Sequence, residues 1–144
     1  MGRIPLQVYY FAGSLRVMAH FWLRIEELSK SIPIKAIVDA GSPVTLVGSL
    51  DTTRMRISPF SLKNLEGRNK PVNIGGGQIT TKILDGTTLK FGSGFEVNMP
   101  VDFPISGESN PFQPSLLGID FLLKTKATLI FNPDKKEAYL EIKE

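Results

Sequence analysis

The segment of residues 36–47, with the sequence AIVDAGSPVTLV, places a single carboxylate between two apolar runs. The first run is rich in β-branched residues and predicts a strand that ends at Asp39. Ala40, Gly41 and Ser42 follow, and the Gly-Ser-Pro sequence indicates a tight turn before the second run. A carboxylate between buried segments costs free energy unless it is paired, hydrogen-bonded or functional. Two interpretations of Asp39 remain open: it either caps a helix or closes a turn with its side chain, or it is a catalytic residue.

Composition limits the classes of function that this chain can have. Its 144 residues correspond to one domain, and its content of 42% hydrophobic and 22% charged residues is typical of a globular protein. The absence of cysteine excludes a disulfide scaffold and a cysteine nucleophile, and it fits a reducing compartment. The single histidine, His20, cannot form a histidine-rich metal site, and the usual base of a serine triad is missing.

Charge and hydropathy patterns indicate neither a nucleic-acid partner nor a membrane partner. The net charge of +3 is distributed without a basic stripe or a base-stacking motif. No run reaches the roughly 18 apolar residues of a membrane span. The first residues also lack the basic start and continuous apolar segment of a signal peptide. We therefore expect a cytoplasmic location.

Ten prolines and thirteen glycines divide the chain into short segments, which is typical of an all-β protein. Apolar residues alternate over residues 15–25 and predict a strand with one buried face. Asp51 or Thr52 is a candidate N-cap of a short helix. Further strands are expected at residues 32–38, at 97–103, and in a final hairpin formed by 125–131 and 138–142.

A second region of interest contains three consecutive glycines among β-forming residues. It comprises Ile74, Gly75, Gly76, Gly77, Gln78 and Ile79. A phosphate-binding loop is not indicated, because neither a Gly-Lys-Ser/Thr sequence nor a helix follows. Two interpretations remain open. The region is either a flexible loop or bulged hairpin, or a mobile hairpin whose glycines let its backbone approach an extended ligand.

The third region is SLLGIDFLL at residues 115–123. It predicts an apolar strand that enters a glycine at Leu117-Gly118 and continues into a short helix. Asp120 is expected to cap that helix or to pair with a lysine. Thr45 either satisfies a backbone group near the Asp39 turn or is an ordinary strand threonine.

Together these three regions resemble the retropepsin-like aspartic proteases, which are homodimeric relatives of retroviral proteases and half-size counterparts of pepsin. Asp39-Ala40-Gly41 is similar to the Asp-Thr-Gly or Asp-Ser-Gly of that family. Residues 74–79 take the place of its flap, and Leu117-Gly118 the place of the hydrophobic–glycine motif that threads behind the catalytic loop.

The resemblance spans residues 32–142 and implies an all-β fold. That fold is a retropepsin-like closed β-barrel or sandwich with a glycine-rich flap hairpin and one short C-terminal helix. Residues 1–31 are then a strand-bearing N-terminal extension packed on the same domain, and residues 32–144 are the aspartic protease domain.

The implied activity is that of an aspartic endopeptidase acting on a peptide or an unfolded protein. Two carboxyl groups a few ångströms apart share one proton and activate one water. Because the chain has one Asp-x-Gly in this context, the second acid must come from a second copy, so Asp39 of each subunit is catalytic in a homodimer. No cofactor and no metal are implied. Asp120 is not expected to be the second acid.

Two residues depart from the family pattern. Ala40 lacks the hydroxyl that braces the two loops across the dimer axis in the family, and Pro43 replaces an acidic residue of the viral members. Natural tolerance, lost activity, an engineered change and a different dimer are all compatible with Ala40. The alternative function is therefore a catalytically impaired, dimeric peptide-binding or assembly domain with the same fold.

Overall fold

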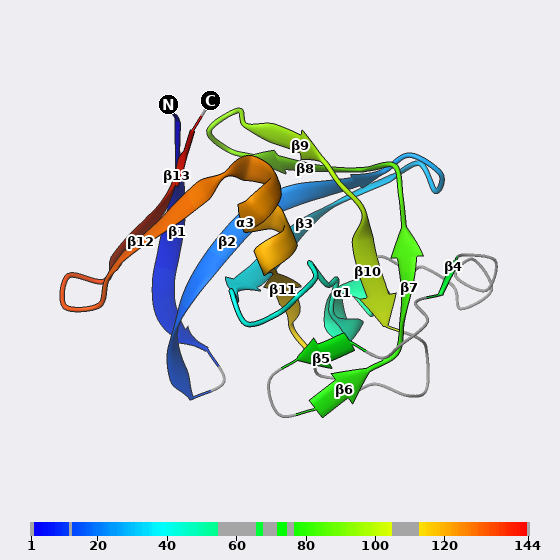
Figure 1. Cartoon of the computed structure of the whole chain (residues 1–144), viewed down its shortest axis with the longest axis horizontal. Helices are drawn as coiled ribbons and strands as arrows, with labels where there is room; N and C mark the ends of the chain where they lie inside the picture. Colours follow the sequence, from blue (N-terminus) through cyan, green and yellow to red (C-terminus); the bar gives the residue numbers. More distant parts are fainter. Residues whose placement is uncertain are drawn as a thin grey trace.

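The longest strand, β2 (Ser14–Ile25), organises the fold shown in Figure 1. The computed structural model describes residues 2–11, 13–54, 66–67, 72–74, 77–104 and 113–143. The first part of β2 pairs with β1 (Gly2–Phe11) and its last part with β8 (Thr87–Phe91). The strand that leads to Asp39, β3 (Lys30–Val38), is antiparallel to β2 from Met18 onwards.

The largest sheet has eight strands among the described residues, in the order β11-β3-β2-β1-β13-β12, with β8 on β2 and β9 on β8. The remaining strands form a three-stranded sheet, β10-β7-β4, and a two-stranded sheet, β5-β6. The bounds not yet given are β4 (Glu66–Gly67), β5 (Val72–Ile74), β6 (Gly77–Ile79), β7 (Thr81–Leu84), β9 (Glu96–Asn98), β10 (Val101–Pro104), β11 (Ser115–Leu117), β12 (Ala127–Asn132) and β13 (Glu137–Ile142).

The all-β prediction is confirmed, but the described strands do not close into the expected barrel. Closure requires every strand to have two neighbours. Within the described ranges, β12 ends the main sheet and pairs only with β13. The expected strand over 97–103 is divided into β9 and β10. The division falls at Met99-Pro100, because proline cannot donate a hydrogen bond to a β-ladder.

The predicted alternation along β2 is confirmed on the face that packs into the main core. Five alternate side chains of β2 are buried: Val17, Ala19, Phe21, Leu23 and Ile25. The opposite face is mixed: Met18 is buried in a smaller cluster, whereas Trp22 is exposed. One face of this strand therefore holds the main core, and the other holds a second, local core near the end of β3.

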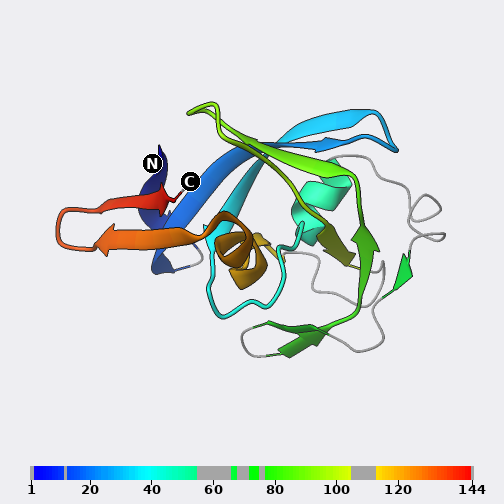
Figure 2. The ribbon, with the colours of Figure 1, turned by 45° about the horizontal axis from the view of Figure 1, so that its top comes forward.

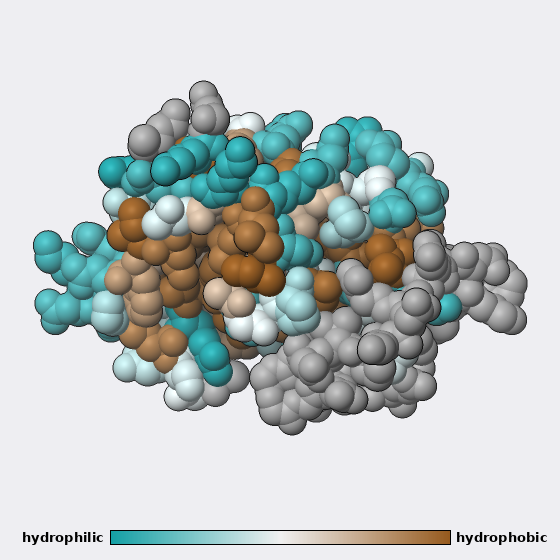
Figure 3. Space-filling model, in the orientation of Figure 1, coloured by the Kyte–Doolittle hydropathy of each residue, from teal (hydrophilic) through white to brown (hydrophobic). Residues whose placement is uncertain are grey.

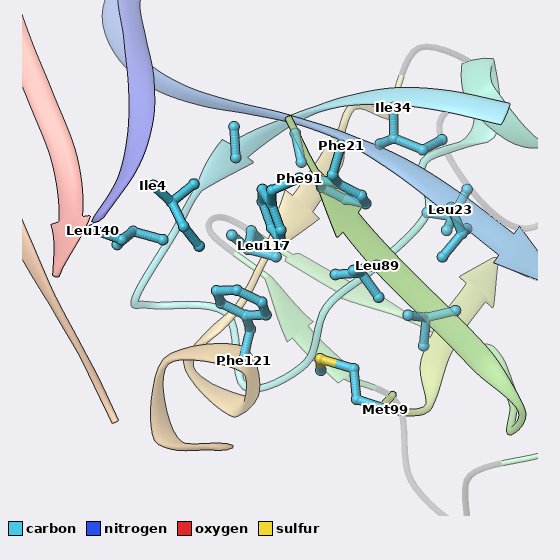
Figure 4. Packing of buried hydrophobic residues seen from close by; sticks show 14 of the residues in the cluster. Ile4, Phe21, Leu23, Ile34, Leu89, Phe91, Met99, Leu117, Phe121 and Leu140 are labelled. Atoms are coloured by element: carbon cyan, nitrogen blue, oxygen red, sulfur yellow. The ribbon is translucent and has the colours of Figure 1, made fainter. Parts of the chain in front are cut away.

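The main core brings the C-terminal helix against the central strands, as Figure 4 shows. The ring centroid of Phe91 lies 5.4 Å from that of Phe21 and 5.5 Å from that of Phe121. Phe121 belongs to α3 (Ile119–Thr125) and is fully buried beside Leu117. Burial of one such side chain stabilises a fold by about 1.5–3 kcal/mol. This packing fixes α3, and with it the Leu117-Gly118 segment, behind the turn that carries Asp39.

The last hairpin is formed by β12 and β13, as predicted, with a turn at residues 133–136. The short helix after the Asp39 region also exists, as α1 (Ser49–Arg54), but it begins before Asp51, so the prediction that Asp51 or Thr52 is its N-cap was wrong. Asp51 lies in its first turn, where it accepts a hydrogen bond from Ser115 Oγ at 2.5 Å. Within the described part of the chain, no helix has the length and apolar character needed to cross a membrane.

The sequence did not predict β1 as a strand. Its first half pairs with β13 and its second half with β2, so it joins the two ends of the chain in one sheet. The strands β1 and β2 therefore lie in the same sheet as six later strands, which are β3, β8, β9, β11, β12 and β13. The domain boundary at residue 31 stays a prediction.

Candidate active site

Asp39 lies immediately after β3, in a turn that its own side chain helps to close. Its backbone N–H donates to Leu117 O at 2.9 Å, which continues the parallel pairing of β3 with β11. The Oδ1 atom of Asp39 accepts from Gly41 N at 2.9 Å, and Ser42 N donates to Asp39 O at 3.1 Å. The carboxylate is half-buried. Within the described residues, no hydrogen bond reaches its second oxygen, Oδ2.

The three residues after Asp39 differ in exposure. Ala40 and Gly41 are exposed, whereas Ser42 is fully buried. Ser42 Oγ donates to Val44 O at 2.7 Å, and Ser42 O accepts from Ile119 N at 2.8 Å. Ser42 therefore has a structural role, because both its side chain and its carbonyl are used to hold the turn against the start of α3.

Gly118 permits a close backbone crossing behind the Asp39 turn. A Cβ atom at this position would lie 2.3 Å from Val44 O and 2.9 Å from Ser42 O. Gly118 N donates to Thr45 Oγ1 at 3.1 Å, so Thr45 does satisfy a backbone group near the turn. A side chain at residue 118 would therefore push apart the two segments that support Asp39.

Sequence reasoning missed the role of Asp120. Its Oδ2 accepts from Thr45 N at 2.9 Å, and its Oδ1 accepts from Thr45 Oγ1 at 2.7 Å. Oδ1 also accepts from Phe121 N at 2.7 Å, whereas the N-cap of α3 is Gly118. Asp120 is therefore not the N-cap, and it forms no ion pair with a lysine among the described residues. It joins α3 to the strand segment that follows the Asp39 turn.

A local apolar cluster supports the turn from below. Its buried members are Met18, Ile37, Val44, Leu46 and Leu116, with Tyr9 and Phe11 packed against them. Leu46 pairs with Leu116 on one side and with Asp102 on the other. The segment after the turn is thus held by main-chain pairing of Leu46 on both sides, and apolar side chains before and after the turn are buried together.

The predicted flap region is a hairpin in its described part. The pairs are Val72 with Ile79, Asn73 with Gln78, and Ile74 with Gly77. Gly75 and Gly76 lie outside the described residues. Figures 1 and 2 both place β5 and β6 on the side of the molecule where residues 39–47 lie. Among the residues that can be described, no group of three or more His, Asp or Glu side chains could hold a metal ion.

Two solved structures are similar to this chain. A retropepsin-like aspartic protease from Rickettsia conorii matches with a TM-score of 0.56 and 16% identity, covering 96% of this chain and 98% of that one. The retroviral protease-like domain of Ddi1 from Leishmania major matches with a TM-score of 0.48 and 11% identity, covering 84% of this chain and 90% of that domain. No family model and no curated protein matches the sequence.

The first of these matches defines the class of fold. It extends over nearly the whole length of both chains, so this protein has the retropepsin-like fold that the sequence predicted. At 16% identity the likeness concerns the fold alone. The roles of the individual residues must be argued from the geometry of this chain.

Proposed function

We propose that this protein is an aspartic endopeptidase that works as a homodimer, with one Asp39 from each subunit. The observation that carries the proposal is the placement of Asp39 at the end of a strand. Its turn is fixed by β11, its Oδ1 is held by Gly41 N–H, and its Oδ2 is uncommitted among the described residues. Such a carboxylate has one oxygen held by the backbone and keeps the other for a water or for a second acid.

In the proposed reaction, two Asp39 carboxyl groups share one proton and hold one water. The ionised group accepts a proton from the water as the water attacks the scissile carbonyl carbon. The protonated group donates its proton to the carbonyl oxygen, where negative charge develops, and a tetrahedral intermediate forms. The first group then gives its proton to the amide nitrogen as the C–N bond breaks, and the second group takes a proton back from a hydroxyl of the intermediate. The amine and the carboxylic acid leave, and the pair again holds one proton. Two carboxyl groups only a few ångströms apart cannot both be ionised, so the pair titrates in two separate steps.

We assign the outer edge of β12, which pairs with no second strand among the described residues, to the contact with the second subunit. The terminal strand β13 is paired on both of its edges, with β1 and with β12, so it cannot accept another strand. On β12, Leu129 is 36% and Phe131 is 40% exposed, and Leu123 of the neighbouring helix α3 is 71% exposed. Figure 3 shows apolar side chains gathered over β12 and α3. An edge strand can pair antiparallel with its own copy about a two-fold axis.

The substrate that fits this arrangement is an extended peptide or an unfolded protein. We assign the role of a flap to residues 74–79, whose hairpin lies on the same side of the molecule as the Asp39 turn. Glycine lets backbone approach backbone closely, which suits hydrogen bonding to an extended chain. No metal or cofactor takes part in the proposed reaction.

The alternative function is a dimeric peptide-binding or assembly domain with the same fold. Ala40 favours this alternative, because it is exposed next to Asp39 and has no hydroxyl to bind across a dimer axis. The two functions differ in one observable, which is cleavage of a bound chain.

The test of catalysis compares the parent protein with Asp39→Asn. Fluorescein-labelled, unfolded casein should be cleaved fastest at acid or mildly acid pH, where the dyad holds one proton, and Asp39→Asn should abolish the cleavage without loss of folding. Casein binding without cleavage by the parent would favour the binding domain. Equal cleavage by both proteins would assign the activity to another group.

The test of assembly measures sedimentation at several protein concentrations. Leu129→Lys should shift the equilibrium towards monomer, because a lysine on a strand edge opposes strand addition. Trp22→Lys is the matched control, since Trp22 is 51% exposed on a different strand. A parent protein that stays monomeric at high micromolar concentration would remove the proposed mechanism.

A further inference from the structure

Asp102 is a buried acid that the proposed reaction does not use. It lies within β10 and is only 1% exposed. Its neighbours Val101 and Phe103 are buried in the main core. An acid in such a place is costly unless its oxygen atoms are hydrogen-bonded. Asp102 Oδ2 accepts from Thr81 Oγ1 at 2.6 Å, and Thr81 is also 1% exposed.

The backbone of Asp102 connects β10 to the segment behind the catalytic turn. Asp102 N donates to Thr45 O at 2.9 Å, and Val47 N donates to Asp102 O at 2.9 Å. These two bonds form a parallel bridge around Leu46. Thr45 is itself held by Asp120. The peptide group of Asp102 is thus attached directly to the supports of Asp39.

The side chain of Asp102 reaches in the other direction, to the base of the β5–β6 hairpin. Thr81 is the first residue of β7, and β6 ends at Ile79, so only Thr80 separates β6 from β7. Thr81 is paired with Pro104, which cannot donate a backbone hydrogen bond. The Thr81 hydroxyl therefore ties the start of β7 to β10 where backbone donors are fewer.

We propose that Asp102 is a positioning residue that sets the β5–β6 hairpin relative to the Asp39 turn. Its backbone holds the strand behind Asp39, and its carboxylate holds the first residue after the hairpin. A hydrogen bond between a hydroxyl and a carboxylate is directional, whereas an apolar contact permits sliding. The inference rests on the proposed function of the hairpin as a flap, and its consequence is that the link controls substrate binding more than bond cleavage.

Four variants test the link. Thr81→Val and Asp102→Leu remove the hydrogen bond, while Thr81→Ser and Asp102→Asn keep a donor and an acceptor. Thr87→Val is the control, because Thr87 is fully buried and its Oγ1 donates to Met99 O, away from the hairpin. All five variants are compared by urea unfolding, so that local effects can be separated from global stability.

The first readout is amide hydrogen exchange, which needs no catalysis. Thr81→Val and Asp102→Leu should speed exchange about tenfold over residues 77–84, relative to β2, as expected for a lost hydrogen bond to a carboxylate. The ratio of the exchange rate over residues 77–84 to that in β2 should stay near the parent value in Thr81→Ser, Asp102→Asn and Thr87→Val. Exchange that is unchanged, or that rises equally in β2, would overturn the inference. Because Thr81 and Asp102 are varied separately, one unfolded variant does not remove the test.

The second readout is the cleavage of labelled, unfolded casein. Loss of the link should raise KM several-fold and leave kcat within about twofold, because the interaction acts on substrate binding. Thr81→Ser should restore KM. A local exchange effect with unchanged KM would reduce the link to a structural contact and would overturn the positioning role. If the parent protein does not cleave casein, the proposed function fails, and binding of casein by the parent and by Thr81→Val takes the place of KM.

Discussion

Asp120 binds Thr45 through both of its carboxylate oxygens, although the two residues are 75 positions apart in the chain. Oδ2 accepts the backbone N–H of Thr45 and Oδ1 accepts its hydroxyl, while the same hydroxyl accepts from Gly118 N. Two sequence regions that were identified separately thus form one hydrogen-bonded unit. This unit, together with the pairing of Asp39 N with Leu117 O, fixes the position of the Asp39 turn.

Asp120→Leu should lower the free energy of unfolding by about 2–4 kcal/mol. The substitution leaves Thr45 N–H and its hydroxyl without an acceptor, and hydrogen bonds to charged groups contribute about 1.5–3 kcal/mol each. Urea unfolding followed by tryptophan fluorescence measures the change. Glu96→Leu is the control, because Glu96 forms an exposed ion pair with Lys90 and should cost less than about 1 kcal/mol. Equal losses in both variants would contradict the role of Asp120.

Gly118→Ala should destabilise the fold by about 3 kcal/mol, because the added methyl group would overlap the backbone of residue 44 and neither segment can move freely. The separation of 2.3 Å from Val44 O is well below any ordinary contact. Gly92→Ala is a matched control, since a Cβ at Gly92 meets nothing within 4 Å. Thermal unfolding of the two variants gives the comparison, and similar melting temperatures would refute the close crossing behind the turn.

Much of the fold was predictable because short-range patterns determine it. Alternating apolar residues identified β2, and continuous apolar runs identified β3 and β11. The strand β1 was not predicted, because its sequence contains Pro5 and only Ile4 of its residues is fully buried. Its second half pairs with the neighbouring β2, but its first half is held by β13, which lies more than 125 positions further along the chain. Local patterns cannot reveal such a partner.

The candidate site was predictable to the same extent. The sequence placed Asp39 after a strand and Gly118 before a helix, and it suggested that Thr45 satisfies a backbone group. The partner of Thr45 remained hidden, because helix position alone made Asp120 a candidate N-cap. Only the crossing of α3 behind the turn brings the two side chains together. The described strands do not close into a barrel, and this too is a property of strand order, which residue patterns do not encode.

His20 should make the fold less stable as the pH falls below about 6.5. The pKa of His20 is lowered, first by burial and second by the positive charge of Lys35, which lies opposite His20 on the neighbouring strand β3. Its Nε2 is buried without a hydrogen-bond partner in the described structure. The centroid of its ring lies 6.4 Å from that of Tyr9, in an edge-to-face arrangement. The unfolded chain then binds a proton at a higher pH than the folded chain does. The stabilisation is complete above the unfolded pKa and is lost as the pH falls towards the folded pKa.

Urea unfolding between pH 4.5 and 7.5 measures this dependence. His20→Phe should flatten the part of the profile just below pH 6.5. Lys35→Gln should reduce the slope without abolishing it, because burial is the larger cause of the lowered pKa. A parent and a His20→Phe profile of equal slope would show that His20 titrates alike in both states.

Ala40→Ser tests whether the Asp39 turn faces a dimer axis. Ala40 is exposed in the single subunit, so the substitution should change the free energy of unfolding of the monomer by no more than about 0.5 kcal/mol. In the proposed dimer, the new hydroxyl restores a hydrogen bond across the axis, and Kd for dimerisation falls by up to about tenfold for each ~1.4 kcal/mol recovered. Serine is a cleaner test than threonine, because threonine also adds a methyl group to a tight turn.

Sedimentation and casein cleavage are measured together. A rise in both indicates a weakened enzyme, and tighter dimers without cleavage indicate the binding domain. If neither quantity changes, the residue lies away from the axis and the proposed dimer is incorrect.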